Sequence, residues 1–398
     1  MFGGVLLREA QYCLHVDKPS GDIFFQVGPL ICTMMTDKIS HDIAERILAW
    51  YARHQRNLPW RKTRDPYHIW VSEVMLQQTQ VETVIPYYQR FLSCFPTVQA
   101  LASASLPEVL KVWENMGYYA RARNLHKAAK EIMERFQGEI PQTWGDLMAL
   151  PGVGNYTAGA ILSVAFDQAA AAVDANVRRV LSRVFAIQKP LHESRTQSHL
   201  WDLAGKLIPI KGAGRFNQGL MDLGATVCTS KKPACGLCPI QDCCQAYERR
   251  LQDVLPVTRK RGPIPHRQVT AAVIWNDSGQ VLIARRPNRG LLGGLWKFPG
   301  GKQNPGESLP RCLRRHVREE LGVQVRVRGP ITSVNHAYTH FLITLHAFHC
   351  AHQTGEPQPL TCADWRWTTL GRLKDFAFSK ADRKIICAVL SQNGGYEA

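Results

Sequence analysis

The feature that most constrains this chain is a loop of four closely spaced cysteines, Cys228, Cys235, Cys238 and Cys244, in a Cys-x6-Cys-x2-Cys-x5-Cys pattern. Thiolates are soft ligands, and four of them suit either zinc or an iron–sulfur cluster. A zinc ribbon usually joins two distant Cys-x2-Cys pairs, whereas a single short loop supplies all four thiols here. The spacing therefore favours a [4Fe–4S] cluster over zinc or unrelated free thiols. Cys243 breaks the spacing by one residue, so we treat it as a spare.

The composition of the chain indicates what kind of partner it binds and in which compartment it works. The chain has 398 residues, which predicts two or three domains. Its net charge of +17 favours a polyanionic partner such as nucleic acid. The 12 cysteines are unevenly spaced, which indicates a reducing compartment rather than a disulfide scaffold. Because we find neither a signal peptide nor an apolar run of ~18 residues, we expect a location in the cytoplasm, near the nucleoid if the source is bacterial.

Hydrophobic spacing divides the chain into a helical part and a part with strands. Residues 35–249 carry apolar residues at helical intervals, and Ser40 is placed to cap the first helix. Residues 250–267 hold three prolines and a basic run, which predicts a linker. Residues 268–398 contain short β-branched stretches and one helix, near LPRCLRRHVREELG. The prediction is an α+β multidomain protein with an all-α first part and a mixed second part.

Residues 1–34 differ from the rest because they carry no clear period and no motif. Met34 and Met35 stand directly before a strongly amphipathic stretch. We therefore interpret residues 1–34 as an extension, and we hypothesise that translation begins at Met34 or Met35.

A glycine-rich turn, LPGVGNYTAGAIL, enters a helix at residues 150–162. Gly152 and Gly154 can adopt φ values that other residues avoid, and their N–H groups can face an anion at the helix start. This arrangement suits a DNA phosphate that is bound without regard to sequence. Asp174 follows about twenty residues later, at the start of a further helix. Such a carboxylate is either a simple N-cap or a functional group.

These motifs, in this order before the cysteine loop, resemble the helix–hairpin–helix DNA glycosylase superfamily of endonuclease III. In that superfamily, relatives that also cleave the strand carry a lysine at the second position after Val-Gly. This chain has Tyr156 there. A Schiff base with the sugar requires an amine, so the resemblance implies a monofunctional glycosylase that uses water.

Three longer stretches resemble the MutY family of adenine DNA glycosylases. They are LPWRKTRDPYHIWVSEVMLQQTQVETVIPYY at 58–88, GYYARARNLH at 117–126 and FNQGLMDLGATVC at 216–228. The resemblance implies that Glu73 is the general acid and base, and we expect a raised pKa there. It places Asp174 at the sugar, either as an electrostatic partner or as a transient nucleophile, and Tyr156 as support. Two carboxylates fit the chemistry, because neutral adenine leaves as an oxocarbenium ion develops.

The same resemblance implies that the base is flipped out of double-stranded DNA before it is removed. The residues implied to line the adenine pocket are Trp60, Arg61, Leu76 and Gln218. The residues implied to contact DNA are Gln78, Thr79, Met116, Tyr118, Gly152 and Gly154. Gln78 would fill the vacated stack, and Met116 with Tyr118 would wedge in beside the opposite base. One catalytic and one recognition domain suggest a monomer.

Residues 268–398 resemble the Nudix fold, the C-terminal domain of the same family, which would have an α/β/α architecture. The resemblance implies that this domain reads 8-oxoguanine opposite the adenine, through Tyr338, Thr339 and His340 in place of a Phe-Ser-His loop. The residues that fit the Nudix hydrolase box are Gly301, Glu307, Arg315, Val317, Glu319, Glu320, Gly322 and Val323. His316 replaces a carboxylate that would hold Mg²⁺, which prefers oxygen ligands. We therefore interpret the box as a retained element of the fold.

Three other functions compete with excision of adenine opposite 8-oxoguanine or guanine. A mismatch enzyme that removes thymine or another base is disfavoured by Gln218 and the Tyr338–His340 loop. A Nudix pyrophosphohydrolase is disfavoured by His316. A catalytically inactive damage sensor is disfavoured by the presence of both Glu73 and Asp174.

Overall fold

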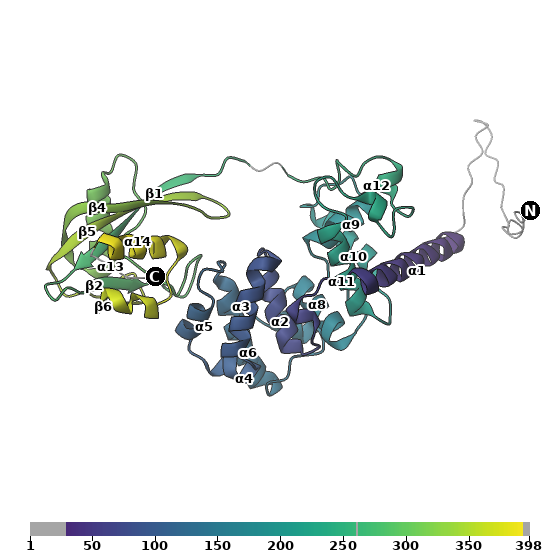
Figure 1. The fold of residues 1–398 in the computed structure, drawn as a ribbon, viewed down its shortest axis with the longest axis horizontal. Helices are drawn as coiled ribbons and strands as arrows, with labels where there is room; N and C mark the ends of the chain where they lie inside the picture. Colours follow the sequence, from purple (N-terminus) through teal and green to yellow (C-terminus); the bar gives the residue numbers. More distant parts are fainter. Residues whose placement is uncertain (1–28, 260–261, 393–398) are drawn as a thin grey trace, which may run out of the picture. The chain divides into compact units, whose positions relative to one another are not determined.

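The computed structural model describes residues 29–259 and 262–392, with side chains from Ser40 onward. Most of the predicted extension, residues 1–28, lies outside this part of the chain. The described residues form two compact units, coloured along the sequence in Figure 1. The first unit holds residues 29–56 and Leu162–Arg259, and the second holds Asn57–Ile161 and residues 262–392. The division falls inside the predicted helical part, so its site residues are distributed over both units.

The first unit is a group of helices around one apolar core. Its elements are α1 (Pro29–His54), α9 (Ala175–Val184), α10 (Ser194–Leu207), α11 (Ala213–Thr226), the 3-10 turn η2 (Cys235–Leu237) and α12 (Gln245–Glu248). Ile47, Leu200, Phe216 and Leu223 are buried together in this core. The prediction that Ser40 caps the first helix is wrong, because α1 begins upstream and runs through that residue. A single serine inside a helix costs too little to end it.

The second unit begins with short helices. They are η1 (Pro59–Arg61), α2 (Pro66–Leu76), α3 (Val81–Cys94), α4 (Val98–Ser103), α5 (Leu106–Val112), α6 (Ala120–Phe136), α7 (Trp144–Ala149) and α8 (Asn155–Phe166), the last of which continues into the first unit. Local signals explain their starts. Asp65 caps α2 by accepting a 2.8 Å hydrogen bond from the Tyr67 N–H. Ser105 and Glu108 form a capping box at α5.

The remainder of the second unit, residues 262–392, is a sheet covered on both faces, which we call the sheet domain. Its elements are β1 (His266–Trp275), β2 (Val281–Arg285), β3 (Trp296–Lys297), α13 (Leu309–Leu321), β4 (Gln324–Ala337), β5 (Leu342–Thr354), β6 (Asp364–Thr368), η3 (Leu370–Asp375) and α14 (Lys380–Gln392). The strand order is β3-β2-β1-β5-β4, with β6 paired to β2. Strands β1 and β5 are parallel, and the other pairs are antiparallel.

Alternating side chains of β1 explain how both faces of the sheet are covered. Val273 faces the core that contains Ile385 of α14, whereas Ile274 faces the core that contains Leu313 of α13. Successive strand residues point to opposite faces, so each helix covers its own face. The α+β multidomain class and the α/β/α sheet domain are confirmed (Figure 1).

The segment predicted as a linker, residues 250–267, is attached to structure at both of its ends. Leu255 is buried against Ala186 and Ala246, and the Leu191 N–H donates a 3.1 Å hydrogen bond to the Val257 carbonyl. Strand β1 already begins at His266. Residues 250–259 and 262–265 therefore lie outside helices and strands, but the described part of the segment is not free of contacts.

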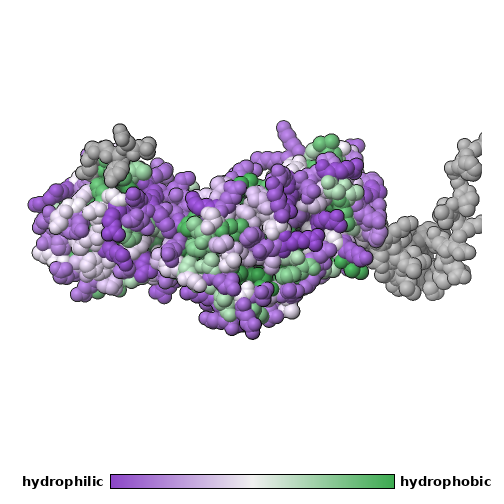
Figure 2. All heavy atoms as spheres, turned by 60° about the horizontal axis from the view of Figure 1, so that its bottom comes forward, coloured by the Kyte–Doolittle hydropathy of each residue, from purple (hydrophilic) through white to green (hydrophobic). Residues whose placement is uncertain are grey.

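The surface shows no membrane-spanning element among the residues that the structure describes. None of their helices is both long enough and apolar enough to cross a bilayer. The face drawn in Figure 2 is largely hydrophilic, with apolar side chains in separate patches.

Candidate active site

A buried carboxylate on α2 forms the centre of the candidate site in the second unit. Glu73 is only 7% exposed, because α2 is buried along most of its length. The Tyr156 hydroxyl, at the start of α8, donates a 2.5 Å hydrogen bond to Glu73 Oε2. The structure thus brings together two of the three residues predicted to be catalytic. A tyrosine hydroxyl in this position orients the carboxylate and leaves its second oxygen to other partners.

The glycine turn before Tyr156 depends on only one of its two glycines. Gly152 has a φ of +79°, and a Cβ there would lie 2.7 Å from Cβ of Asn124. Gly154 has no left-handed φ and open space around it, so only Gly152 uses the conformational freedom that the sequence analysis noted for both glycines. Its carbonyl accepts the first bond of α8, from the Ala158 N–H at 2.9 Å. Both glycines are exposed at the helix start, as contact with a phosphate requires.

Two loops predicted to enter DNA hold strained backbone. Gln78 has a φ of 59°, and in the second loop Asn115 and Tyr118 have φ values of 72° and 48°. Residues other than glycine adopt such values at a cost of ~1–3 kcal/mol each, and they persist only where the surroundings enforce them. We call residues 115–118 the wedge loop. Tyr118 is 37% exposed, but Met116 is 6% exposed, which contradicts its predicted role as a wedge and makes it the packed base of the loop.

Arg121, which the sequence analysis missed, supports both of these loops from α6. Its Nη1 donates to the carbonyls of Val74, Met75 and Gln77, at 3.0, 2.8 and 2.5 Å, and so closes the end of α2. Its Nη2 donates to Thr79 Oγ1 at 3.1 Å and to the Gly117 carbonyl at 3.4 Å. Burial lowers the pKa of the guanidinium to about 10. The sequence signal that could have revealed this role is the position of Arg121 on the apolar face of α6, because a buried arginine needs several hydrogen-bond acceptors.

The residues predicted to line an adenine pocket differ in exposure. Trp60 is 5% exposed and packs edge-on against Tyr88, with ring centroids 5.4 Å apart. It is therefore a core aromatic with little surface for a ligand. Arg61 and Leu76 are partly exposed. In the first unit, Gln218 on α11 accepts a 2.5 Å hydrogen bond from the hydroxyl of Tyr51 on α1, which orients its amide.

Asp174 lies in the first unit, where it is the N-cap of α9. Its Oδ1 accepts a 2.7 Å hydrogen bond from the Val177 N–H, and its Oδ2 accepts one of 3.0 Å from Asn176 Nδ2. Burial raises the pKa of the Asp174 carboxyl, although these hydrogen bonds oppose the shift. The capping role is therefore real. It is compatible with a functional role, because a poorly solvated anion is available to stabilise nearby positive charge.

The four predicted thiol ligands line one cavity in the first unit. Cys228, Cys235, Cys238 and Cys244 share its wall with mainly apolar side chains of α9 and α11. Cys243 is absent from this wall and points to Asp42 Oδ2, 3.7 Å from its sulfur. No three potential ligands converge on a single point among the described residues. Thiols spread around a cavity fit a cluster of several atoms better than one zinc ion, whose sulfurs lie ~2.3 Å from the metal.

Two arginines of α9 connect the cysteine loop to the helix that Asp174 begins. Arg183 is 2% exposed and donates to Cys228 Sγ at 3.3 Å and to the Thr229 carbonyl at 2.7 Å. Arg179 donates to the Cys228 carbonyl at 2.8 Å. The sequence analysis missed this role, although both arginines lie within ten residues of Asp174. The loop and α9 therefore form one hydrogen-bonded assembly.

The predicted 8-oxoguanine loop, residues 338–340, forms a tight turn that we call the reading loop. The Tyr338 N–H donates a 2.9 Å hydrogen bond to the Phe341 carbonyl, and the two rings pack 4.9 Å apart. Burial raises the pKa of the Tyr338 hydroxyl to about 12. Thr339 and His340 are exposed, and Thr339 Oγ1 lies 2.8 Å from the Tyr118 hydroxyl of the wedge loop.

Cationic side chains already pair with the carboxylates of the Nudix box. Arg315 makes two 2.8 Å hydrogen bonds to Glu307, and Lys297 forms a buried 2.8 Å ion pair with Glu320. His316 Nε2 lies 2.9 Å from the Lys302 carbonyl. Because these carboxylates are paired with cationic side chains of the protein itself, they support the interpretation of the Nudix box as an element of the fold and not as a Mg²⁺ site.

Comparison with known proteins agrees with this geometry. A family model described as "HhH-GPD superfamily base excision DNA repair protein" matches residues 71–206, and one described as "NUDIX domain" matches residues 270–388. The adenine DNA glycosylase of Rattus norvegicus is 37% identical over 392 residues, 85% of this chain and 76% of the rat protein. That of Homo sapiens is 36% identical, with 88% and 74% covered. That of Buchnera aphidicola subsp. Schizaphis graminum is 36% identical, with 76% and 85% covered. This chain is therefore an enzyme of the adenine DNA glycosylase family.

Proposed function

We propose that this enzyme hydrolyses the N-glycosidic bond of adenine opposite 8-oxoguanine or guanine in double-stranded DNA. The observation that carries the proposal is the buried Glu73 carboxylate, held by Tyr156 next to an exposed glycine turn. A general acid positioned at the leaving base contributes ~10²–10⁴-fold to such a reaction. The membership of the adenine DNA glycosylase family supports adenine as the base.

The chemistry follows from these groups. Protonated Glu73 gives its proton to adenine N7, so that the base leaves neutral while the C1′–N9 bond breaks. The electron pair of that bond goes to adenine, and a sugar oxocarbenium ion forms. Asp174 stabilises the positive charge, as the second carboxylate does in glycoside hydrolysis. Glu73 then accepts a proton from the water that attacks C1′, which leaves a free adenine and an abasic site.

Because position 156 carries a tyrosine and not an amine, the reaction is expected to stop after the base is removed. A phenol cannot form a Schiff base with the opened sugar, so the same residue cannot lead to strand cleavage. We therefore propose a monofunctional enzyme whose product is an intact strand with an abasic site.

We also propose how the DNA is opened and read. Gln78 and Tyr118 are exposed on loops with fixed, strained backbone, which suits insertion into a base stack. Adenine is flipped out, and the reading loop, residues 338–340, contacts 8-oxoguanine. We propose a monomer that acts in the cytoplasm, at the nucleoid if the source is bacterial. The high positive charge supports binding to DNA phosphates.

A duplex with one adenine opposite 8-oxoguanine tests this function. After incubation and alkali treatment, we expect a break at the adenine, and no break without alkali. A duplex with adenine opposite guanine should react more slowly, and thymine opposite guanine should not react. If the adenine strand survives alkali, the proposed function is wrong. A break without alkali would refute the monofunctional mechanism.

We further propose that the four wall cysteines, Cys228, Cys235, Cys238 and Cys244, hold a [4Fe–4S] cluster. When bound, such a cluster cross-links its loop, and we assign it this structural role rather than a catalytic one. Arg179 and Arg183 transmit the order of the loop to α9, which carries Asp174 at its start.

The neighbouring cysteines provide a matched test of this site. Cys238→Ser should lower the iron content and the visible absorbance of the purified protein, and weaken DNA binding. Cys243→Ser should leave both unchanged, because Cys243 does not line the cavity. Equal iron loss in the two variants would refute this choice of ligands, and unchanged affinity of Cys238→Ser would refute the supporting role.

A further inference from the structure

A buried carboxylate connects the wedge loop to the sheet domain. Glu114 immediately precedes this loop, and its side chain is 11% exposed. Its Oε1 accepts a 2.7 Å hydrogen bond from Arg383 Nε and one of 2.8 Å from the Phe378 N–H. Its Oε2 accepts a 2.8 Å hydrogen bond from Lys111 Nζ. These partners keep the pKa of the Glu114 carboxyl below its usual range despite burial, so the group is an anion at neutral pH.

The wedge loop needs such an attachment because its backbone is strained. Asn115, Gly117 and Tyr118 all have positive φ values, and two of these residues are not glycine. Inside the helical segment, Trp113 Nε1 and Arg121 Nη2 both donate to the Gly117 carbonyl, at 3.0 and 3.4 Å. These bonds hold the middle of the loop. Glu114 attaches the start of the loop to the sheet domain, through Phe378 and Arg383.

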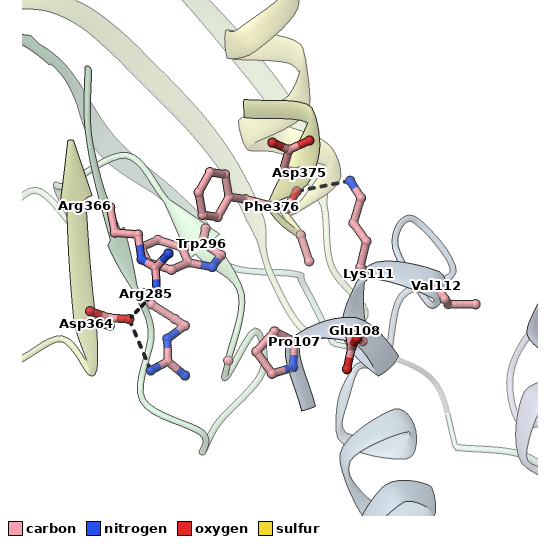
Figure 3. A pocket seen from close by; sticks show the side chains of 12 residues that line it. Pro107, Glu108, Lys111, Val112, Arg285, Trp296, Asp364, Arg366, Asp375 and Phe376 are labelled. Atoms are coloured by element: carbon pink, nitrogen blue, oxygen red, sulfur yellow. Dashed lines mark hydrogen bonds and ion pairs between the residues drawn. The ribbon is translucent and has the colours of Figure 1, made fainter. Parts of the chain in front are cut away.

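Polar bonds dominate the junction between α5 and the sheet domain. A hollow with a volume of about 460 Å³ lies at this junction. Figure 3 shows that charged side chains line it together with apolar ones such as Trp296 and Phe376. Lys111 reaches across to the Phe376 carbonyl at 3.2 Å, as drawn. A second polar attachment joins Arg123 to the carbonyls of Gly293 and Gly290, at 2.8 Å each. Hydrogen bonds therefore largely determine how the wedge loop meets the sheet domain.

The contact between the wedge loop and the reading loop depends on this attachment. The hydroxyls of Tyr118 and Thr339 lie 2.8 Å apart and are exposed to solvent. An exposed hydroxyl pair is too weak to set the spacing of two loops by itself. Glu114 is four residues from Tyr118, and its partners Phe378 and Arg383 belong to the sheet domain that carries Thr339. A shift at Glu114 is therefore expected to displace Tyr118 relative to the reading loop.

We infer that Glu114 is a positioning residue that sets the preference for adenine opposite 8-oxoguanine over adenine opposite guanine. This inference rests on the proposed function. Glu114 holds the wedge loop, beside the base opposite adenine, in register with the reading loop that examines that base. This relative position of the two loops speeds excision only for a substrate whose opposite base the reading loop recognises. Loss of the attachment therefore slows excision opposite 8-oxoguanine and leaves excision opposite guanine nearly unchanged.

The test is the ratio of two single-turnover rates, measured with the full-length protein on A·8-oxoguanine and A·G duplexes. Glu114→Gln removes the charge but keeps the shape, and we expect the ratio to fall roughly 5–20-fold. Glu134→Gln is the matched control, because Glu134 is exposed on α6 and should leave the ratio unchanged. Arg383→Lys is a milder variant. It keeps the positive charge near Glu114 but loses the hydrogen bond that Arg383 Nη2 donates to the Phe376 carbonyl, so it should lower the ratio less.

The possible outcomes are distinct. A Glu114→Gln protein with an unchanged ratio overturns the inference, as does an equal fall of both rates, which would show a merely structural role. In the double variant with Arg383→Gln, the fall of the ratio should be smaller than the product of the two single falls, because the two side chains bond to each other, and independent effects would overturn the inference. A wild-type protein that releases no adenine from either duplex would refute the proposed function, whereas equal wild-type rates on the two duplexes would overturn this inference alone.

Discussion

Glu73→Gln is expected to lower the single-turnover rate of adenine release by about 10³-fold or more, while the affinity for the A·8-oxoguanine duplex stays within a few-fold. Glutamine keeps the size of the side chain and can still accept the Tyr156 hydrogen bond, so the fold should persist. It has no proton of suitable acidity to give to adenine, and loss of a general acid costs ~10²–10⁴-fold. Rapid-quench assays and gel-shift titrations measure the two quantities separately.

Two further variants show whether the effect belongs to the acid itself. Tyr156→Phe leaves the Glu73 carboxylate in place but removes its 2.5 Å hydrogen bond. We expect the rate of adenine release to fall about 10-fold, which corresponds to the usual contribution of one such bond. Glu82→Gln changes an exposed carboxylate on α3 and should have no effect. A Glu73→Gln enzyme that releases adenine at the wild-type rate would refute the mechanism, whatever the other variants do.

Arg121→Met is expected to lower the free energy of unfolding by about 3–5 kcal/mol, because it leaves buried carbonyls without donors. The guanidinium serves three carbonyls at the end of α2 and one in the wedge loop. Methionine fills much of the same volume but donates no hydrogen bond. Urea unfolding followed by circular dichroism measures the change. DNA affinity should fall as well, because Gln78 and Tyr118 lose their common support.

The controls for Arg121 separate charge from geometry. Arg121→Lys keeps the charge, but an ammonium cannot reach both loops with a planar fork, so we expect an intermediate loss. Arg135→Met, at the exposed end of α6, should change stability by no more than about 0.5 kcal/mol. Equal stability of Arg121→Met and Arg135→Met would show that the network around Arg121 contributes nothing.

Sequence patterns predicted the features that depend on local chemistry. Spacing within one segment predicted the position of Tyr156 at the start of α8, the helix start at Asp174 and the group of four thiols. The fold class could be predicted because hydrophobic periodicity changes from helical to alternating near His266. The resemblance of the motifs supplied the family, and the comparisons confirm it.

Features that depend on packing between distant segments could not be predicted. Met116 is buried because the rest of the chain covers it, and no property of its neighbours in sequence shows this. Gly154 occupies ordinary backbone, although its Gly-x-Gly setting resembles a strained turn. Apart from Gly117, the hydrogen-bond partners named for Arg121 and Arg183 stand more than forty residues away in the sequence, so the role of these arginines appears only in three dimensions.

The hydrogen bonds at Asp174 have a consequence for the timing of catalysis. Both oxygens of this cap accept hydrogen bonds within the segment that begins α9, one from the Val177 N–H and one from Asn176. A side chain fixed in this way has lost its rotational freedom during folding rather than during substrate binding. In the mechanism that we propose, the carboxyl group of Asp174 is thus positioned before adenine binds, and the reaction does not have to wait for a flexible side chain to become ordered.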